Sequence, residues 1–237
     1  MDNKRKLCGL LIALALLPGC KTRESGVKGF WDEVPLIEED IHISEDRFAD
    51  FAELAVDSPE KDALAALDKL FDRLSEDEVA YYVYSGWMEE AFYSVLSPCR
   101  NYALFSHAVQ RMNEDAVIDE YTRERLLRDV AWMEYNQVGS PAIIPGVATP
   151  ASRTLVLLLD VGCPSCRDAL ERMTSDPQWK DLSHVAVLFG LGSKPDMEGW
   201  DSISLAHPEA IFDPGFTPVY FIVSADGLVE QSYTPVM

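Results

Sequence analysis

A cluster of glycine and proline residues divides this chain into two parts with different hydrophobic patterns. The cluster consists of Gly139, Pro141, Pro145, Gly146 and Pro150. Glycine weakens regular structure and proline removes a backbone donor, so neither a helix nor a strand is expected to run through this segment. We therefore expect a connector over residues 139–153, with one domain before it and another after it.

The part before the cluster has the pattern of an all-α domain over residues 31–138. Apolar residues recur at spacings of three and four, as expected of helices that each bury one face. Ser44 is expected to cap the first helix, and later helices are expected after Pro59, after Pro98 and up to Met133. Together with the helix described next, these make about five amphipathic helices.

The third expected helix carries the signature of a capping box. Ser75 and Glu78 stand three positions apart, as in the motif whose two side chains each accept from a backbone N–H of the first turn. The face expected to be buried consists of Val79, Tyr82, Val83 and Trp87.

After the cluster the pattern becomes that of an α/β domain over residues 154–237. Thr154–Leu159 is a continuous apolar run, typical of a strand that is covered on both faces. A helix is expected over residues 163–173, and a second buried strand at Val185–Phe189. Two further strands are expected to form a hairpin, namely Val219–Val223 and Leu228–Tyr233, joined at Asp226-Gly227.

The first twenty residues have the features of an export signal. Basic residues precede an apolar run over positions 7–17, which is shorter than the roughly 20 residues that a membrane-spanning helix needs. Leu17-Pro18-Gly19-Cys20 then resembles the lipobox of bacterial lipoproteins. The resemblance implies a signal peptide over residues 1–19, lipid attached to Cys20, and a lipidated tether over residues 20–30. The alternative is an uncleaved anchor or an ordinary secretory signal.

The chain is acidic, with 40 Asp and Glu against 20 Lys and Arg and a net charge of −20. Nucleic acid binding requires a clustered positive surface, so nucleic acid is excluded as a partner. We interpret the acids as the solvated outer faces of the helices.

The sequence Cys163-Pro164-Ser165-Cys166 falls between the first expected strand of the α/β domain and its helix. A thiol at a helix N-terminus faces free N–H groups and the positive end of the dipole, which lowers its pKa. Cys163 is therefore the expected nucleophile. Cys166, one turn later, is placed to resolve a mixed disulfide by attacking Cys163.

Two other roles for this cysteine pair stay open. A zinc site would need about four ligands, and no second pair or His-x₃-His spacing accompanies the motif, so we expect no metal. A permanent structural disulfide would close a short loop, which gains little entropic stabilisation. Cys99 is interpreted as a small packed or partly exposed thiol near a helix start, and the alternative is a third redox partner.

Two stretches of the second domain resemble the thioredoxin-like proteins. Leu155–Arg167 is similar to the first core strand and active-site helix of that fold. Phe216–Val223, followed by Ala225–Val229, is similar to its cis-proline loop, the next strand and the hairpin. Threonine before the proline is typical of exported thiol oxidoreductases of the membrane-anchored kind.

The resemblance implies a redox site and no cofactor. Cys163 and Cys166 would be the catalytic residues and would form the reversible disulfide. The peptide bond before Pro218 would be cis, Pro218 would face the sulfur of Cys163, and the backbone of Thr217 would pair with an extended substrate.

The chain also departs from the thioredoxin pattern. Leu157 stands where the family carries a buried acid that assists proton transfer, and Gly162 stands where tryptophan is common. The connector is too short for the usual leading hairpin. Because the chain ends at Met237, directly after the hairpin, we expect the closing helix to be absent and the helical domain to cover that face of the sheet.

The first part of the chain has a relative of its own. Ser97–Tyr102 and Asn136–Ala142 resemble a helical domain of unknown function that precedes thioredoxin-like domains in lipoproteins of certain Gram-negative anaerobes. The expected fold class is therefore an N-terminal all-α domain followed by a C-terminal thioredoxin-like α/β domain.

These features favour a lipid-anchored thiol:disulfide oxidoreductase that faces the periplasm. Its expected partners are exported proteins that carry thiols or disulfides, an upstream redox donor or acceptor, and the membrane that holds the lipid on Cys20. Lys21 favours the outer over the inner membrane. The alternative, suggested by Leu157 and the missing helix, is a redox-inert binding module whose helical domain is the partner-binding surface.

Overall fold

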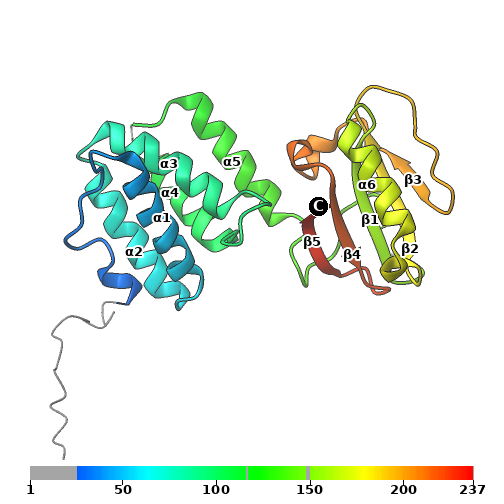
Figure 1. Ribbon diagram of the computed structural model, residues 1–237, viewed down its shortest axis with the longest axis horizontal. Coiled ribbons are helices and arrows are strands. Elements are labelled where there is room, and N and C mark those ends of the chain that lie inside the picture. The colour runs from blue at the N-terminus through cyan, green and yellow to red at the C-terminus, as the bar shows by residue number, and fades with distance from the viewer. Residues whose placement is uncertain (1–25, 116, 148–149, 237) are drawn as a thin grey trace, which may run out of the picture.

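The computed structural model describes residues 26–115, 117–147 and 150–236. Figure 1 shows a group of helices in one half of the molecule and a sheet in the other half. The chain is thus all-α at first and α/β afterwards, as expected from the sequence. The predicted signal peptide and the lipidation site at Cys20 lie outside the described residues.

Five α-helices form the helical domain: α1 (Ile41–Val56), α2 (Glu60–Leu74), α3 (Glu78–Phe92), α4 (Tyr102–Glu114) and α5 (Glu120–Glu134). Aromatic side chains dominate the core between them, and fully buried ones include Trp31, Phe51, Phe71, Tyr84, Phe92 and Phe105. Val27 also joins this core, so packed structure begins within the range assigned to the tether. Within the described part of the chain, no helix combines the length and the apolar character that a membrane crossing needs.

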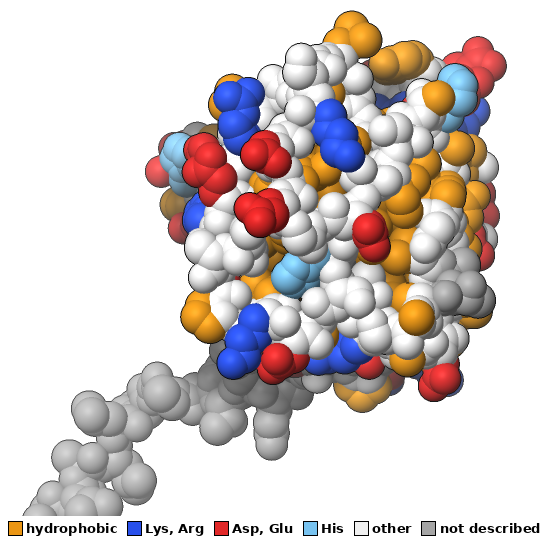
Figure 2. Space-filling view, turned by 90° about the vertical axis from the view of Figure 1, so that its right-hand side faces the viewer, with side chains coloured by type: hydrophobic (Ala, Val, Ile, Leu, Met, Phe, Trp, Pro, Cys, Tyr) orange, Lys and Arg blue, Asp and Glu red, His pale blue; other side chains and the backbone are white. Residues whose placement is uncertain are grey.

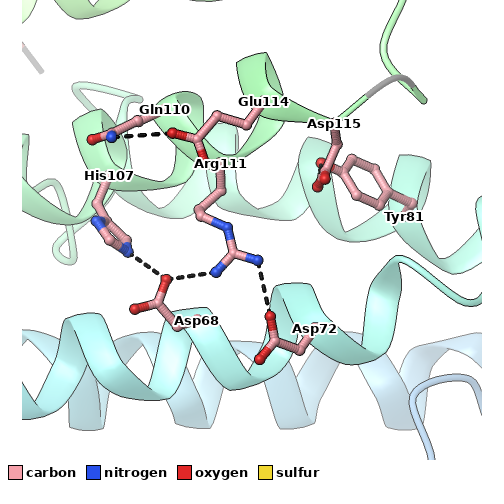
Figure 3. A network of polar contacts seen from close by, with 8 residues as sticks. All are labelled: Asp68, Asp72, Tyr81, His107, Gln110, Arg111, Glu114 and Asp115. Atoms are coloured by element: carbon pink, nitrogen blue, oxygen red, sulfur yellow. Dashed lines mark hydrogen bonds and ion pairs between the residues drawn. The ribbon is translucent and has the colours of Figure 1, made fainter.

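A polar network joins α2 to α4 (Figure 3). Arg111 donates to Asp68 at 2.7 Å and to Asp72 at 3.0 Å, and Nε2 of His107 lies 2.9 Å from the same oxygen of Asp68. Burial raises the pKa of Asp68, but the hydrogen bonds from Arg111 and His107 outweigh it and lower the pKa. Partly exposed ion pairs contribute about 1 kcal/mol or less each, so the network mainly aligns two helices that the core already holds.

The predicted start of α1 was wrong. Asp40 caps this helix, because its side chain accepts a hydrogen bond from the N–H of His42 at 3.1 Å. Ser44 lies inside the helix, completely buried, where its Oγ accepts from the N–H of Glu38 at 2.9 Å. Ser44 therefore holds the preceding segment against the helix instead of starting it.

The predicted cap and buried face of α3 were also wrong. Asp77, not Ser75, caps the helix, and its side chain accepts from the N–H groups of Val79 and Ala80 at 3.1 and 3.0 Å. The side chain expected to begin the buried face, Val79, is 72% exposed. The face that enters the core consists of Ala80, Tyr81, Tyr84, Met88 and Phe92.

The second part contains a five-stranded sheet with the order β3-β2-β1-β4-β5. The strands are β1 (Thr154–Asp160), β2 (Ser183–Phe189), β3 (Asp201–Ser204), β4 (Val219–Val223) and β5 (Val229–Pro235), and the helix α6 (Pro164–Ser175) follows β1. β1 to β3 run parallel to one another, while β4 is antiparallel to both β1 and β5. The short edge strand β3 was not predicted, because its Asp-Ser-Ile-Ser sequence has no apolar run.

Different segments cover the two faces of the sheet. α6 covers one face through Cys166, Leu170 and Met173. The other face was expected to be covered by the helical domain. Ala142, Ile144 and Val147 of the predicted connector and Phe212 pack on it, and Val95 of the helical domain packs against the same cluster. We therefore assign residues 139–147 to the α/β domain, which comprises residues 139–236. Within the described residues, no helix follows β5.

Backbone hydrogen bonds tie the connector to the start of β5. The N–H of Gly139 donates to the carbonyl of Val229 at 2.8 Å, and the N–H of Val229 donates to the carbonyl of Ser140 at 2.9 Å. The N–H of Ala142 donates to the carbonyl of Gly227 at 2.8 Å. Residues 139–142 are therefore joined to the α/β domain by backbone hydrogen bonds.

Candidate functional site

Cys163 lies at the junction between β1 and α6. It is the N-cap residue of α6, with Pro164 in the first turn, and its N–H donates to the carbonyl of Asp160 at 3.1 Å. The N–H of Val161 donates to the carbonyl of Phe189 on β2 at 2.9 Å, which fixes the turn to the sheet. The half-exposed thiol of Cys163 thus stands at the N-terminal end of a helix, as expected from the sequence.

Ser165 supplies the strongest interaction at the Cys163 sulfur. Its Oγ lies 2.9 Å from Sγ of Cys163, and this hydrogen bond is the main cause of a lowered pKa at Cys163. Partial burial opposes the shift, while the backbone N–H groups of Cys166 and Ser165 support it. A lowered pKa increases the fraction of thiolate at neutral pH, and the thiolate is the nucleophilic form. The sequence analysis credited the helix N-terminus and missed Ser165, although it stands inside the motif.

Cys166 differs from Cys163 both in exposure and in the direction of its pKa shift. It is buried, with 2% of its surface exposed, and burial is the main cause that raises its pKa to about 11. The neighbouring Cys163 also raises this pKa, whereas the backbone of Asp160 and the hydroxyl of Thr217 lower it. Both cysteines are free thiols in this structure. One cysteine is therefore suited to attack and the other to remain protonated until it is needed.

The Thr217-Pro218 peptide bond is cis, as the thioredoxin resemblance implied. Pro218 directly precedes β4, whose first residue, Val219, pairs with Leu158 near the end of β1. The hydroxyl of Thr217 contributes to the environment of Cys166, so the structure brings this loop to the cysteine pair. The approach of Pro218 to the Cys163 sulfur and the pairing of Thr217 with a substrate stay predictions.

A cleft of about 690 Å³ lies beside the cysteine pair. One wall is α6, and the other is the loop over residues 193–198 that follows β2. The charged side chains that line it are Asp160, Arg167, Glu171, Lys194, Asp196 and Glu198. Figure 2, which views the molecule from the α/β side, shows hydrophobic surface among scattered charges of both signs. A cleft of this size can hold several side chains of a polypeptide.

The position of the family's buried acid is filled by an apolar side chain. Leu157 is completely buried in β1, between Ala186 of β2 and Tyr220 of β4. Among the described residues of the α/β domain, no carboxyl group is buried. Asp160 is half-buried, accepts from the N–H of Gly162 at 2.8 Å and lines the cleft. Asp160 is thus a carboxylate of the cleft and does not occupy the position of the family's buried acid.

Cys99 does not join the other two cysteines. It lies in the core of the helical domain, while Cys163 and Cys166 belong to the cluster around α6. Burial, with a smaller effect from Glu53 and Asp57, raises its pKa, which disfavours the nucleophilic thiolate form. Within the described residues, no three side chains of the His, Cys, Asp and Glu types are grouped to hold a metal ion.

Comparison with known proteins supports the fold. No protein-family model matches the chain, and no curated protein matches it in sequence. A solved structure, that of a thioredoxin-like protein from Bacteroides caccae, is similar with a TM-score of 0.67 and 18% identity, covering 86% of each chain. Because the α/β domain is less than half of the chain, this match includes helices of the helical domain as well. The chain thus has a thioredoxin-like fold preceded by a helical domain.

Proposed function

We propose that this protein is a thiol:disulfide oxidoreductase that exchanges disulfides with exported proteins. The observation that carries the proposal is the contrast between its two cysteines. Cys163 is accessible and has a lowered pKa, whereas Cys166 is buried and has a raised one. A nucleophile that is exposed as thiolate and a partner that stays protonated are what a two-step exchange requires.

In the reducing direction, the thiolate of Cys163 attacks one sulfur of a substrate disulfide. A mixed disulfide forms, and the second substrate sulfur leaves as a thiolate that takes a proton from water. Cys166 then loses its proton and attacks Sγ of Cys163, which releases the first substrate sulfur as a thiolate. The substrate has gained two electrons, and the protein holds a Cys163–Cys166 disulfide that an upstream dithiol donor reduces. The same steps reversed oxidise a substrate dithiol.

The environment of Cys166 supports this order of steps. Part of the rise in its pKa comes from the hydrogen bond and charge of Cys163. Once Cys163 is bonded to a substrate sulfur, it carries no charge and that part disappears, so Cys166 ionises more easily in the mixed disulfide. The resolving thiol is therefore activated only after the first step has occurred.

A trapping experiment tests the proposed function. In Cys166→Ala, the mixed disulfide has no resolving thiol, so disulfide-linked adducts with envelope proteins should accumulate and disappear on reduction. The double variant Cys163→Ser/Cys166→Ala is the matched control and should form none. Recovering no adducts from Cys166→Ala, together with a Cys163 that resists alkylation at pH 7, would sink the proposal.

The proposed location is the cell envelope, with lipid on Cys20 as the anchor. Val27 already packs into the helical domain, so only residues 21–26 separate Cys20 from the folded protein. The helical domain would then lie close to the membrane surface, and the α/β domain with its cysteine pair lies in the other half of the molecule (Figure 1). Cys20→Ala should lose labelling by radioactive palmitate and move from the membrane to the soluble fraction, and separation of the two membranes would test the preference for the outer one.

A redox-inert binding module is the second candidate, and the buried Leu157 favours it. In that case the chain would not catalyse disulfide reduction in spite of its cysteine pair. Insulin reduction in the presence of dithiothreitol separates the two candidates. Activity of the wild type that Cys163→Ser abolishes excludes the inert module.

A further inference from the structure

Asp213 shapes the turn that leads to the cis-proline. Pro214–Phe216 forms one turn of 3-10 helix, and Oδ1 of Asp213 caps it by accepting from the N–H of Gly215 at 2.8 Å. The carbonyl of Asp213 accepts from the N–H of Phe216 at 3.3 Å, and Oγ1 of Thr217 donates to the carbonyl of Pro214 at 3.1 Å. The carboxylate thus fixes the backbone directly before Pro218.

Tyr93 of the helical domain binds the other oxygen of that carboxylate. Its hydroxyl donates to Oδ2 of Asp213 at 2.7 Å, across 120 positions of sequence. Its ring lies against Phe216, with 4.9 Å between the ring centroids. Burial, followed by the bond to Asp213, raises the pKa of Tyr93, so the hydroxyl keeps the proton that it donates. One side chain of the helical domain therefore contacts both ends of the turn.

Tyr93 is itself held firmly. Its N–H donates to the carbonyl of Glu89 at 3.0 Å, and its own carbonyl accepts from Nε of Arg100 at 3.0 Å. Its ring stacks on Phe105, with 5.0 Å between the centroids. The guanidinium of Arg100 also lies 5.0 Å above the ring of Tyr233 in β5. The donor is thus fixed to the helical domain and, through Arg100, to the sheet.

Besides the bond between Tyr93 and Asp213, two further hydrogen bonds join the helical domain to the α/β domain. Nε1 of Trp132 donates to the carbonyl of Glu209 at 2.8 Å, and the hydroxyl of Tyr233 donates to the carbonyl of Trp132 at 3.1 Å. Glu209 belongs to the same segment as Asp213, between β3 and β4. The helical domain therefore contacts this segment at two places: at Glu209 through Trp132, and at Asp213 through Tyr93.

We propose that Tyr93 is a positioning residue for the substrate-binding loop, a role that rests on the proposed function. By holding Asp213, it keeps Thr217 and Pro218 in the position in which an extended substrate pairs with the loop. The helical domain is then part of the support of the redox site. Loss of the hydroxyl should impair substrates that pair with the loop and spare those that only meet the Cys163 sulfur.

Tyr93→Phe tests the proposal, and Tyr81→Phe is its matched control. Tyr81 is also buried, and its hydroxyl donates to Oδ2 of Asp115 at 2.7 Å, but both residues lie within the helical domain (Figure 3). Each variant removes one hydroxyl from one carboxylate. A difference between them therefore reports on the loop and not on the loss of a buried tyrosine hydroxyl.

Four measurements are made on each variant: hydrogen exchange, insulin reduction, reduction of a small disulfide, and the pH profile of Cys163 alkylation. Hydrogen exchange of residues 211–220 reports on the turn without depending on activity. Insulin reduction reports on a polypeptide substrate, and reduction of a small aromatic disulfide reports on the sulfur alone. Tyr93→Phe should speed exchange of this segment and raise KM for insulin by about 3- to 10-fold, the size expected for the loss of one ordinary hydrogen bond. The small-disulfide rate and the pH profile of Cys163 alkylation should not change, and Tyr81→Phe should match the wild type in all of these.

Asp213→Ala gives an independent route if Tyr93→Phe does not fold. It should raise KM for insulin at least as much, and adding Tyr93→Phe to it should have no further effect on KM. If the wild type reduces insulin and Tyr93→Phe has the same KM for insulin, the positioning role of Tyr93 is overturned, even when hydrogen exchange becomes faster. The proposed function stands in that case. A wild type that reduces no disulfide overturns the proposed function, and unchanged exchange in Tyr93→Phe would show separately that Tyr93 does not hold the turn.

Discussion

The Oγ of Ser165, in the first turn of α6, lies 2.9 Å from the Sγ of Cys163, the N-cap residue of that helix. In the thiolate form of Cys163 the hydroxyl donates to a charged acceptor, which is a stronger hydrogen bond than the one to a neutral thiol. The contact therefore stabilises the charged form selectively, and it is the main cause of the lowered pKa.

Ser165→Ala should raise the pKa of Cys163 and lower its reactivity near neutral pH. The rate of alkylation by iodoacetamide, followed from pH 5 to pH 10, should reach its plateau at higher pH than in the wild type. Because the thiolate belongs to the reduced form, its loss also makes the reduction potential more negative. Ser193→Ala, which removes a hydroxyl that lines the cleft, is the control and should leave the profile in place. An unchanged alkylation profile in Ser165→Ala would refute this assignment.

Resolution by Cys166 should depend on pH more steeply than attack by Cys163. Burial is the main cause that holds the pKa of Cys166 near 11, and burial persists in the mixed disulfide. The thiolate fraction, and with it the resolution rate, should therefore keep rising with pH from about 6 to 9. Stopped-flow release of a fluorescent thiol from a preformed Cys163 adduct measures this rate, and a plateau below pH 8 would contradict it.

Local sequence features predicted that the cysteine pair lies between a strand and a helix, but they did not predict the contacts between distant residues. The buried strand, the cysteine motif and the proline at its first turn are neighbours in sequence, so the start of α6 at Pro164 followed from them. The pairing of Tyr93 with Asp213 joins residues 120 positions apart, and neither carries a local signal of the other. The support of the cis-proline loop could therefore emerge only from the assembled structure.

The wrong face of α3 has a physical cause of the same kind. Residues 79–84 read Val-Ala-Tyr-Tyr-Val-Tyr, so apolar or aromatic side chains surround this part of the helix and more than one face satisfies the helical spacing. In the folded domain Tyr81 and Tyr84 are buried, and they donate to Asp115 and to the carbonyl of Leu36. Tyr82 also donates, to the carbonyl of Val117 at 2.7 Å, but its side chain stays 45% exposed. Such partners are set by tertiary packing and not by periodicity.

Asp129 should make the protein less stable as pH rises through the acidic range. Its buried side chain accepts from Arg125 at 3.0 Å, but Arg125 also binds both oxygens of Glu89 at 2.6 and 2.8 Å. Burial is the main cause that raises the pKa of Asp129 to about 7. An unfolded aspartate ionises near pH 4, so unfolding releases a proton between about pH 4 and 7, and the contribution of Asp129 to stability falls across that interval.

Asp129→Asn should remove this decline, so the variant should be more stable than the wild type at pH 8 and similar to it at pH 4. Urea unfolding at several pH values measures the difference. Asp68→Asn is the opposite control, because the lowered pKa of Asp68 gives stability that is present above about pH 4 and lost below it. That variant should be less stable than the wild type at pH 8. Equal stability of wild type and Asp129→Asn across the range would show that Asp129 is not buried as a neutral acid.

The last helix of the helical domain ends at Glu134, before the glycine and proline cluster, and apolar residues within that cluster cover one face of the sheet. Ile144 is completely buried against that face, while its neighbour Ile143 is 42% exposed. Ile144→Ala should therefore cost about 2 to 5 kcal/mol of unfolding free energy, as expected for deleting a buried isoleucine. Ile143→Ala, the same change one position earlier, should change the free energy of unfolding by less than about 0.5 kcal/mol. If urea unfolding shows the same loss of stability in both variants, the segment is only a link between the domains. Other residues would then have to cover the face of the sheet opposite α6.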